Sequence, residues 1–175
     1  MPQTTSRPPV PTFDQVAALP VTQTTIIPQD FIDQYGHMNV KFHMQIGLGG
    51  FPRLYEGDSI GTDARTEPPA DMGGLFTAEH HLRYYAEAKL GETVTTHARI
   101  VGHSDKVIHV IMLNVNQDTR ELSSTLEATL IHVSLETRRP TALPTAMAEY
   151  LSRQVEEQSS LDWDAPLCGA MGVRR

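Results

Sequence analysis

The side chains best suited to chemistry lie in one short segment, residues 33–39, which begins with a carboxylate at Asp33 and ends with an amide at Asn39. A carboxylate can attack a carbonyl carbon directly, or it can take a proton from an attacking water. His37 and Asn39 are the nearest polar side chains, and either could orient that carboxylate or the carbonyl oxygen. We therefore take Asp33, His37 and Asn39 as the candidate catalytic residues.

The residues that follow this segment predict a helix that begins beside Asp33. Apolar side chains recur at three- and four-residue spacing over residues 39–55, and Asn39 is a typical N-cap. The first N–H groups of a helix lack intrahelical partners and carry positive dipole character, so the amides around Gly36 and Met38 are candidates to bind an oxyanion. Gly36 has no side chain and would let a substrate approach the backbone closely.

On the residues alone, another interpretation stays open. An Asp and an Asn that flank a helix start are most often turn and capping residues. The helix itself is imperfect, because three glycines weaken it and a proline should break it near its end (Gly47, Gly49, Gly50 and Pro52).

After residues 57–73, which have the composition of a long loop, the periodicity changes to the alternation typical of strands. We expect long strands at residues 74–86, 93–102, 106–116 and 121–137, a short one at 21–27, and a terminal helix at 145–158. The joins between the long strands are short, which implies antiparallel neighbours. One face of the strand at 106–116 carries Val107, His109, Ile111, Leu113 and Val115.

This order of elements predicts an α+β architecture in which a curved antiparallel sheet wraps around one long helix. Three parts are expected: an extended or disordered lead-in over residues 1–20, one domain over residues 21–144, and a C-terminal helix and tail over residues 145–175.

Composition excludes several classes of protein. The 175 residues carry a net charge of −7 without a basic block, which argues against nucleic-acid binding. No apolar run is long enough to span a membrane, the first twenty residues do not read as a signal peptide, and a single cysteine, Cys168, fits a reducing compartment, so we expect a cytoplasmic protein. No metal site is expected, because His80 and His81 would point to opposite faces of a strand and no ligand motif is present.

Three stretches in the right order resemble the 4-hydroxybenzoyl-CoA thioesterase-like branch of the hot-dog superfamily. They are residues 33–39, which match an Asp-x-x-Gly-His-x-Asn pattern before the helix, residues 83–92, and residues 135–144. The resemblance covers residues 21–144 and implies acyl-CoA thioester hydrolysis by Asp33. It implies no cofactor beyond coenzyme A, which is part of the substrate, and a homodimer or a dimer of dimers. Asp30 does not match the pattern, and Val40 stands where many relatives have a second Asn.

A closer resemblance, to the thioesterases of bacterial carnitine degradation, rests on residues 36–40, 79–84 and 105–109. It implies betainyl-CoA, whose trimethylammonium group has no N–H donors and needs aromatic faces or a carboxylate. Glu79 and Tyr85 are the candidate substrate-binding residues. Other aromatics that could contribute are Phe42, Phe51, Tyr55, Phe76, Tyr84 and Trp163, although an isolated Trp near a terminus more often docks the tail.

The phosphates of coenzyme A need cations, and Arg138 with Arg139 form a local positive spot at a strand end, ahead of Arg83 and Lys106. Two other functions remain open on the same fold. A non-catalytic acyl-CoA-binding protein would not need Asp33, and a hydratase or dehydratase would need an Asp and a His that act on adjacent carbons.

Overall fold

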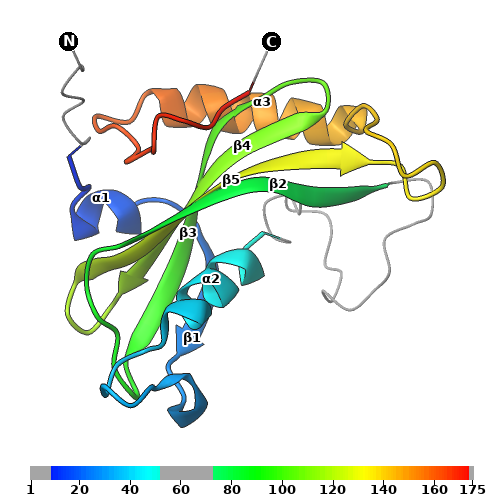
Figure 1. Ribbon diagram of the computed structural model, residues 1–175. Coiled ribbons are helices and arrows are strands. Elements are labelled where there is room, and N and C mark those ends of the chain that lie inside the picture. The colour runs from blue at the N-terminus through cyan, green and yellow to red at the C-terminus, as the bar shows by residue number, and fades with distance from the viewer. Residues whose placement is uncertain (1–8, 52–72, 174–175) are drawn as a thin grey trace, which may run out of the picture.

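A computed structural model describes residues 9–51 and 73–173, and Figure 1 shows their arrangement. One antiparallel sheet has the strand order β1-β3-β4-β5-β2. Its strands are β1 (Val21–Ile26), β2 (Gly74–Tyr84), β3 (Thr93–His103), β4 (Val107–Asn116) and β5 (Glu121–Val133). The helices are α1 (Phe13–Ala17), the 3-10 turn η1 (Gln29–Phe31), α2 (Val40–Gly49) and α3 (Thr145–Ser159). The predicted α+β fold is confirmed.

The sheet has two buried faces because successive side chains of a strand point in opposite directions. Val110 and Met112 point to the face that α2 and α3 cover, which we call the helix face. Ile111 and Leu113 point to the face that α1 and the C-terminal segment cover, which we call the tail face. The predicted alternation along β4 is confirmed, and the side chains of β4 are buried on both faces.

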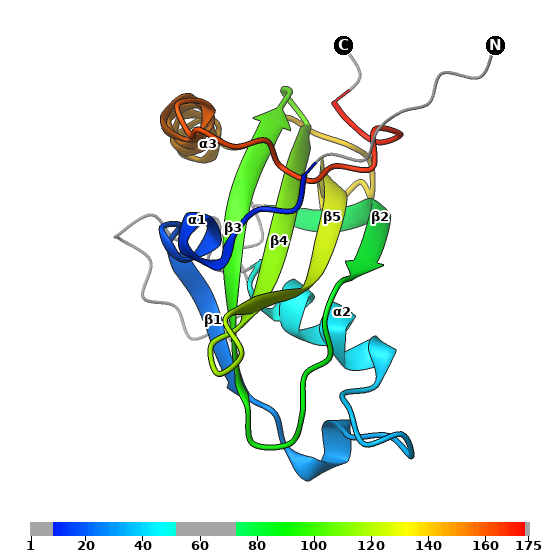
Figure 2. The same ribbon diagram turned by 90° about the vertical axis from the view of Figure 1, so that its left-hand side faces the viewer.

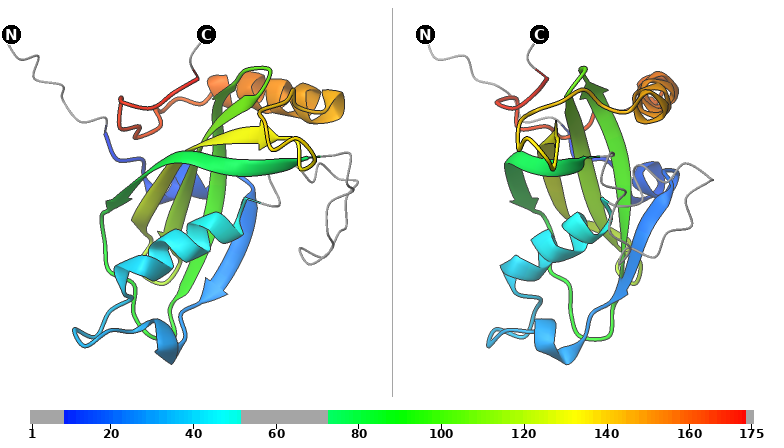
Figure 3. Two further views of the ribbon diagram at one scale, coloured as in Figure 1. Left: turned by 45° about the vertical axis from the view of Figure 1, so that its right-hand side comes forward. Right: turned by 90° about the vertical axis from the view of Figure 1, so that its right-hand side faces the viewer.

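Helix α2 begins where the sequence predicted and ends earlier. The side chain of Asn39 accepts a hydrogen bond from the Lys41 N–H at 3.2 Å, so the predicted N-cap is confirmed. The last residue of α2 is Gly49, and the predicted continuation from residue 52 to 55 and the loop up to residue 72 lie outside the described residues. Figure 3 shows α2 lying across the sheet.

Two glycines let the end of α2 approach the helix face closely. A Cβ atom on Gly47 would lie 3.0 Å from the side chain of Leu126. A Cβ atom on Gly50, just after the helix, would lie 2.6 Å from Met112 and from Thr22. The glycines that weaken the helix as an isolated segment therefore permit its contact with the sheet.

Helix α3 covers the part of β3 that β1 leaves unpaired. The pairing of β1 with β3 stops at Val21 and His97. Beyond that point the Ile100 N–H donates to the side-chain oxygen of Gln158 at 2.6 Å, and Leu151 is fully buried. An amphipathic terminal helix thus protects a strand edge that would otherwise be open.

The extended lead-in predicted for residues 1–20 is wrong for its second half. Residues 13–17 form α1, and Thr12 and Gln15 cap its N-terminus with a reciprocal capping box. Val16 and Leu19 are buried against the tail face, so packing and capping together stabilise this short helix. Residues 1–8 lie outside the described part of the chain.

The C-terminal segment, residues 161–173, which we call the tail, returns across the tail face after α3. Trp163 is buried there, its carbonyl accepts a hydrogen bond from Arg99 at 2.7 Å, and the Arg99 guanidinium lies 4.3 Å from the indole centre. Trp163 thus docks the tail onto the sheet, as expected of an isolated Trp near a terminus. Figure 2 shows the tail beside α3 and apart from α2. Among the described residues, no helix combines the length and the apolar character needed to cross a bilayer.

Candidate active site at the start of helix α2

Residues 33–37 form a tight turn between Ile32 and Met38, which pair as an isolated bridge. The Asp33 N–H donates to the His37 carbonyl at 3.0 Å, and the Gly36 N–H donates to the Asp33 carbonyl at 3.1 Å. Gly36 has a φ of 83°, a left-handed conformation that glycine adopts without strain. The turn therefore holds Asp33 at a fixed place just before α2.

The carboxylate of Asp33 is anchored by one oxygen. Its Oδ1 accepts a hydrogen bond from the Tyr35 N–H at 2.9 Å, while its Oδ2 lies 3.8 Å from Nδ1 of His37. The Asp33 side chain is 17% exposed and that of His37 is 30% exposed. Asp33 is thus oriented by the backbone, close to an imidazole, and still within reach of a substrate.

Two of the predicted amide donors are already used within the chain. The Met38 N–H donates to the Ala88 carbonyl at 2.7 Å, and the Gly36 N–H closes the turn. The expectation that Gly36 and Met38 supply oxyanion donors is therefore wrong in this geometry. The first amide of α2 belongs to Val40, and within the described residues it donates to no acceptor.

The sequence contained the signal for Val40, because the residue after an N-cap has the first unpaired amide of a helix. The amide of Asn39 is not available, since it donates to the Phe31 carbonyl at 2.9 Å. The side-chain oxygen of Asn39 caps Lys41, so the alternative capping interpretation also holds for this residue. The free donor lies one residue later than the segment we considered.

A buried polar row crosses the helix face beneath α2. His43 Nδ1 lies 3.0 Å from the Ser124 hydroxyl, which accepts a hydrogen bond from the Asn114 amide at 2.9 Å. Asn114 in turn accepts one from Thr96 at 2.9 Å. Burial, and secondly the nearby His37, lower the pKa of His43 to about 4, so this imidazole is neutral near pH 7.

The proposed substrate-binding residues separate into two groups. Tyr85 packs on the tail face, where its hydroxyl lies 3.5 Å from Arg83, so its predicted place in the site is wrong. Tyr84, its neighbour, points the other way and meets the ring of His43 edge-on at 5.2 Å between centroids. Tyr84 is 46% exposed. Glu79 is exposed on the same edge strand but shares the tail face with His81 and Tyr85, so its predicted place in the site is also wrong.

The other candidate aromatics have varied surroundings. Phe42 stacks on Phe31 with 3.9 Å between ring centroids, and Phe51 is buried in the core. Phe76 is 44% exposed on β2, and Tyr55 lies outside the described residues.

The arginines proposed for coenzyme A lie at the far end of the sheet in the same subunit. Arg138 and Arg139 are exposed in the loop after Val133, whereas Ser124, which contacts His43, lies near the other end of β5. At about 3.3 Å per residue, roughly 30 Å of strand separates those ends. Figure 1 shows this amber loop and the blue turn before α2 at opposite ends. Arg138 and Arg139 therefore cannot bind a substrate that lies at Asp33 of their own subunit.

The lower-ranked cations and the rival carboxylate have other surroundings. Arg83 donates to the Pro166 carbonyl at 3.2 Å and so holds the tail. Lys106 lies 3.9 Å from the carboxylate of Asp105. Asp30 is exposed in η1, as expected of a solvent-facing turn residue.

Comparison with known proteins identifies the fold and the family. A family model described as the thioesterase-like superfamily matches residues 27–151. An L-carnitine dehydrogenase/betainyl-CoA thioesterase of Ruegeria pomeroyi is 31% identical over 82% of this chain, and a betainyl-CoA thioesterase of Pseudomonas aeruginosa is 27% identical over 65%. The matched part is 28% of the Ruegeria protein and 69% of the Pseudomonas protein.

Solved structures agree with the fold. A hypothetical protein of Staphylococcus aureus in complex with CoA superimposes with a TM-score of 0.73 at 22% identity, over 89% of this chain and 97% of that one. A hexameric broad-specificity acyl-coenzyme A thioesterase superimposes with a TM-score of 0.62 at 11% identity, over 79% and 99%. The chain belongs to the thioesterase-like superfamily and has its α+β hot-dog fold.

Proposed function

We propose that the chain hydrolyses acyl-CoA thioesters, with Asp33 as nucleophile or general base and the Val40 N–H as an oxyanion donor. The observation that carries this proposal is the pairing of an anchored, accessible carboxylate with an unused amide at the same helix start. The names of the relatives and the CoA bound to a structural neighbour support the substrate class.

The reaction needs a nucleophile on one side of the carbonyl and donors on the other. Asp33 attacks the acyl carbon or deprotonates a water that does so, and negative charge develops on the carbonyl oxygen. The Val40 N–H, at the positive end of α2, stabilises that charge. The C–S bond then breaks, and coenzyme A leaves as a thiolate that takes a proton from solvent. On the nucleophile route the acyl group is left on Asp33 as a mixed anhydride, which a water then hydrolyses to release the acid and restore the carboxylate. On the general-base route the acid forms directly, and Asp33 returns its proton to solvent. His37, at 3.8 Å, positions the carboxylate during these steps.

Free thiol released from a panel of acyl-CoA esters tests this function directly. Short, branched, aromatic and cationic acyl groups should be compared at equal concentration. Flat traces for every ester, together with retained binding of coenzyme A, would favour the non-catalytic acyl-CoA-binding alternative.

The proposed acyl group is short and bears a trimethylammonium, as in betainyl-CoA. The two named relatives support it, as does the exposed ring of Tyr84 on β2. A cation–aromatic contact contributes about 0.5–2 kcal/mol, which corresponds to a preference of roughly two- to thirtyfold in kcat/KM. Equal or faster hydrolysis of the neutral analogue 3,3-dimethylbutyryl-CoA would contradict the cationic pocket and leave the thioesterase proposal intact.

A homodimer joined at β2 completes the proposed site. β2 is an edge strand in the described part of the chain, residues 76–80 on it are exposed, and they include the apolar ring of Phe76. Antiparallel pairing of two β2 edges sets the first residues of one strand beside the last residues of the other. The loop with Arg139 of the partner subunit then lies at the Asp33 end, where a coenzyme A phosphate would need a cation.

Mixed dimers test this arrangement. One subunit carries Asp33→Asn, and the other carries Arg138→Ala with Arg139→Ala. If the arginines act across the interface, one site of the mixed dimer is wholly native, and it should show the KM of the wild type at half its kcat. If the cations act in their own subunit, no site has both parts, and KM stays as high as in the double arginine variant.

A further inference from the structure

The tail face contains a second cluster of reactive side chains, distant from Asp33 in the fold. Glu127 on β5 is directly opposite His81 on β2 and Ile111 on β4, so both His81 and Glu127 point to the tail face. Cys168 of the tail lies over them. One ligand atom each from His81, Glu127 and Cys168 lie within 4.8 Å of one another.

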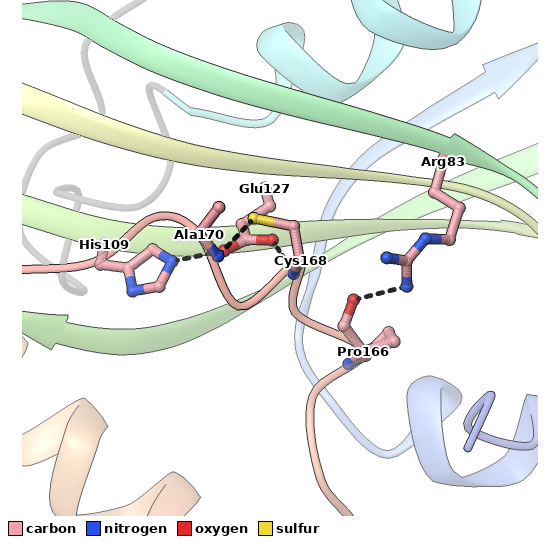
Figure 4. A network of polar contacts seen from close by, with 6 residues as sticks. All are labelled: Arg83, His109, Glu127, Pro166, Cys168 and Ala170. Atoms are coloured by element: carbon pink, nitrogen blue, oxygen red, sulfur yellow. Dashed lines mark hydrogen bonds and ion pairs between the residues drawn. The ribbon is translucent and has the colours of Figure 1, made fainter. Parts of the chain in front are cut away.

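Glu127 is held by partners that leave lone pairs on both of its oxygens. Its Oε1 accepts from His109 Nε2 at 2.9 Å, and its Oε2 accepts from the Cys168 N–H at 2.6 Å, as Figure 4 shows. The side chain is 1% exposed. These hydrogen bonds orient the carboxylate, and each oxygen keeps a lone pair that a cation could bind.

The sulfur of Cys168 is also prepared for ligation. The Ala170 N–H lies 3.4 Å from it and points a donor at the thiolate that a metal would bind, and Gly169 between them turns the chain with a φ of 75°. Cys168 is only partly buried and sits on a tail without regular secondary structure, so it can move by an ångström more easily than a strand residue.

We propose that His81, Glu127 and Cys168 form a zinc site that fastens the tail to the sheet. Imidazole, carboxylate and thiolate together suit Zn²⁺ and not the hard cations Mg²⁺ and Ca²⁺. In a tetrahedral site with bonds of about 2.0–2.3 Å, ligand atoms lie roughly 3.4 Å apart, so distances of up to 4.8 Å need to shorten by about 1.4 Å at most. His109 orients the carboxylate from behind, and the fourth position is open to water.

Binding should follow a defined proton balance. Cys168 loses its thiol proton to solvent as the Zn–S bond forms, while Glu127 enters as a carboxylate and His81 as a neutral imidazole. The site does not depend on thioester hydrolysis, since it lies on the opposite face of the sheet from α2.

The test is a titration of the full chain, freed of any affinity tag, with Co²⁺ and then with Zn²⁺ against a competing chelator. We expect one equivalent per chain, a near-ultraviolet thiolate-to-Co²⁺ charge-transfer band, and displacement of Co²⁺ by Zn²⁺. Cys168→Ala should abolish the charge-transfer band. His109→Gln, which removes a hydrogen-bond partner of the ligand Glu127, should weaken metal binding by roughly 10- to 100-fold. His81→Ala, which removes a ligand, should weaken metal binding by more than that. Cys168→Ala should leave the protein folded, because Cys168 lies outside the core.

His80→Ala is the matched control, because His80 is the same residue type one position away, exposed, and on the other face of β2. It should bind like the wild type. Absence of the charge-transfer band from the wild type, its survival in Cys168→Ala, or an equal loss of affinity in His80→Ala and His81→Ala would each overturn the proposal.

Discussion

The molecule contains two pairs of a carboxylate and a histidine, and their surroundings differ sharply. Asp33 and His37 lie 3.8 Å apart in a turn, both partly exposed, and one carboxylate oxygen has no hydrogen bond from the described backbone. Glu127 and His109 lie 2.9 Å apart beneath the tail, both buried, with each carboxylate oxygen bonded. The first pair is available for chemistry on a substrate, whereas the second holds the fold together.

The largest expected effect is a loss of thioesterase activity on mutation of Asp33 in the exposed pair. Asp33→Asn should lower kcat by about two to four decades, because a positioned acid–base group contributes about that much, and more if Asp33 is the nucleophile. Binding of coenzyme A should persist, as measured by calorimetry. Asp30→Ala is the control, since this neighbouring carboxylate is solvent-facing, and near-native turnover in Asp33→Asn would remove Asp33 from the mechanism.

The free energy of unfolding should depend more on the buried pair of Glu127 and His109 than on the exposed pair of Asp33 and His37. In chelator-treated protein, Glu127→Gln should reduce the free energy of unfolding by about 1.5–3 kcal/mol, because it removes the charged acceptor from a buried hydrogen bond with His109. Asp33→Asn should change it by less than about 1 kcal/mol, as for exposed pairs. Urea unfolding checks both. A double variant, Glu127→Gln with His109→Gln, should lose less than the sum of the single changes, and strict additivity would show that the pair is not coupled.

A third histidine, His43, should make the stability of the protein depend on pH. The pKa of His43 is about 4 in the folded protein and near 6.5 when unfolded, so only the unfolded chain binds this proton as the pH falls from 6.5 towards 4. Native stability should therefore be complete above pH 6.5 and fall by about 3 kcal/mol across that window, at 1.36 kcal/mol per pKa unit.

His43→Asn isolates this contribution. The groups that face His43 are His37 from the turn, Tyr84 from β2, and the neutral Ser124 and Asn114 from the sheet. Unfolding at several pH values should give a shallower slope in the variant than in the wild type, since the buried His97, whose pKa is also lowered, titrates in both. Equal slopes would mean that His43 is charged or exposed in the folded state.

The smallest expected effect concerns the turn that carries Asp33. Gly36→Ala should cost about 1–2 kcal/mol, because a side chain is placed at a φ of 83°. Among the described residues, no atom beyond the two neighbours of Gly36 lies within 4 Å of the added Cβ, so the loss measures backbone strain. Gly36→Asn should lose less, since Asn tolerates this conformation. Equal stability of all three proteins, measured by thermal unfolding, would show that the turn adopts another conformation.

Local residue patterns predicted the parts of the fold that depend on local forces. The alternation of Val107 to Val115 and the cap at Asn39 were sufficient to place β4 and the start of α2. The missed helix α1 also had a local signal, the capping box of Thr12 and Gln15, which the surrounding prolines obscured.

Contacts between distant segments decided what the sequence did not show. The carbonyl that occupies the Met38 amide belongs to Ala88, fifty residues further along the chain, and no local pattern reveals it. The placement of Tyr84 and Tyr85 depends on the phase of β2, which shifts at an irregularity between Thr77 and Glu79. The expectation of no metal rested on short ligand spacings, whereas His81, Glu127 and Cys168 meet only through strand pairing and the return of the tail.

The close approach of α2 to the sheet at Gly47 and Gly50 sets a limit on length. A chain that enters between helix and sheet from the Asp33 end meets this contact after about 10 Å, since seven helical residues rise 1.5 Å each. A methyl group added at Gly47 or Gly50 would meet the side chains of Leu126, Met112 or Thr22 at 2.6–3.0 Å. If the acyl group of the proposed substrate enters there, we expect the end of α2 to limit its length, so that a compact head group fits while a long fatty acyl tail turns out to the surface. Gly47 and Gly50 would in this way set the length of acyl group that the proposed active site accepts.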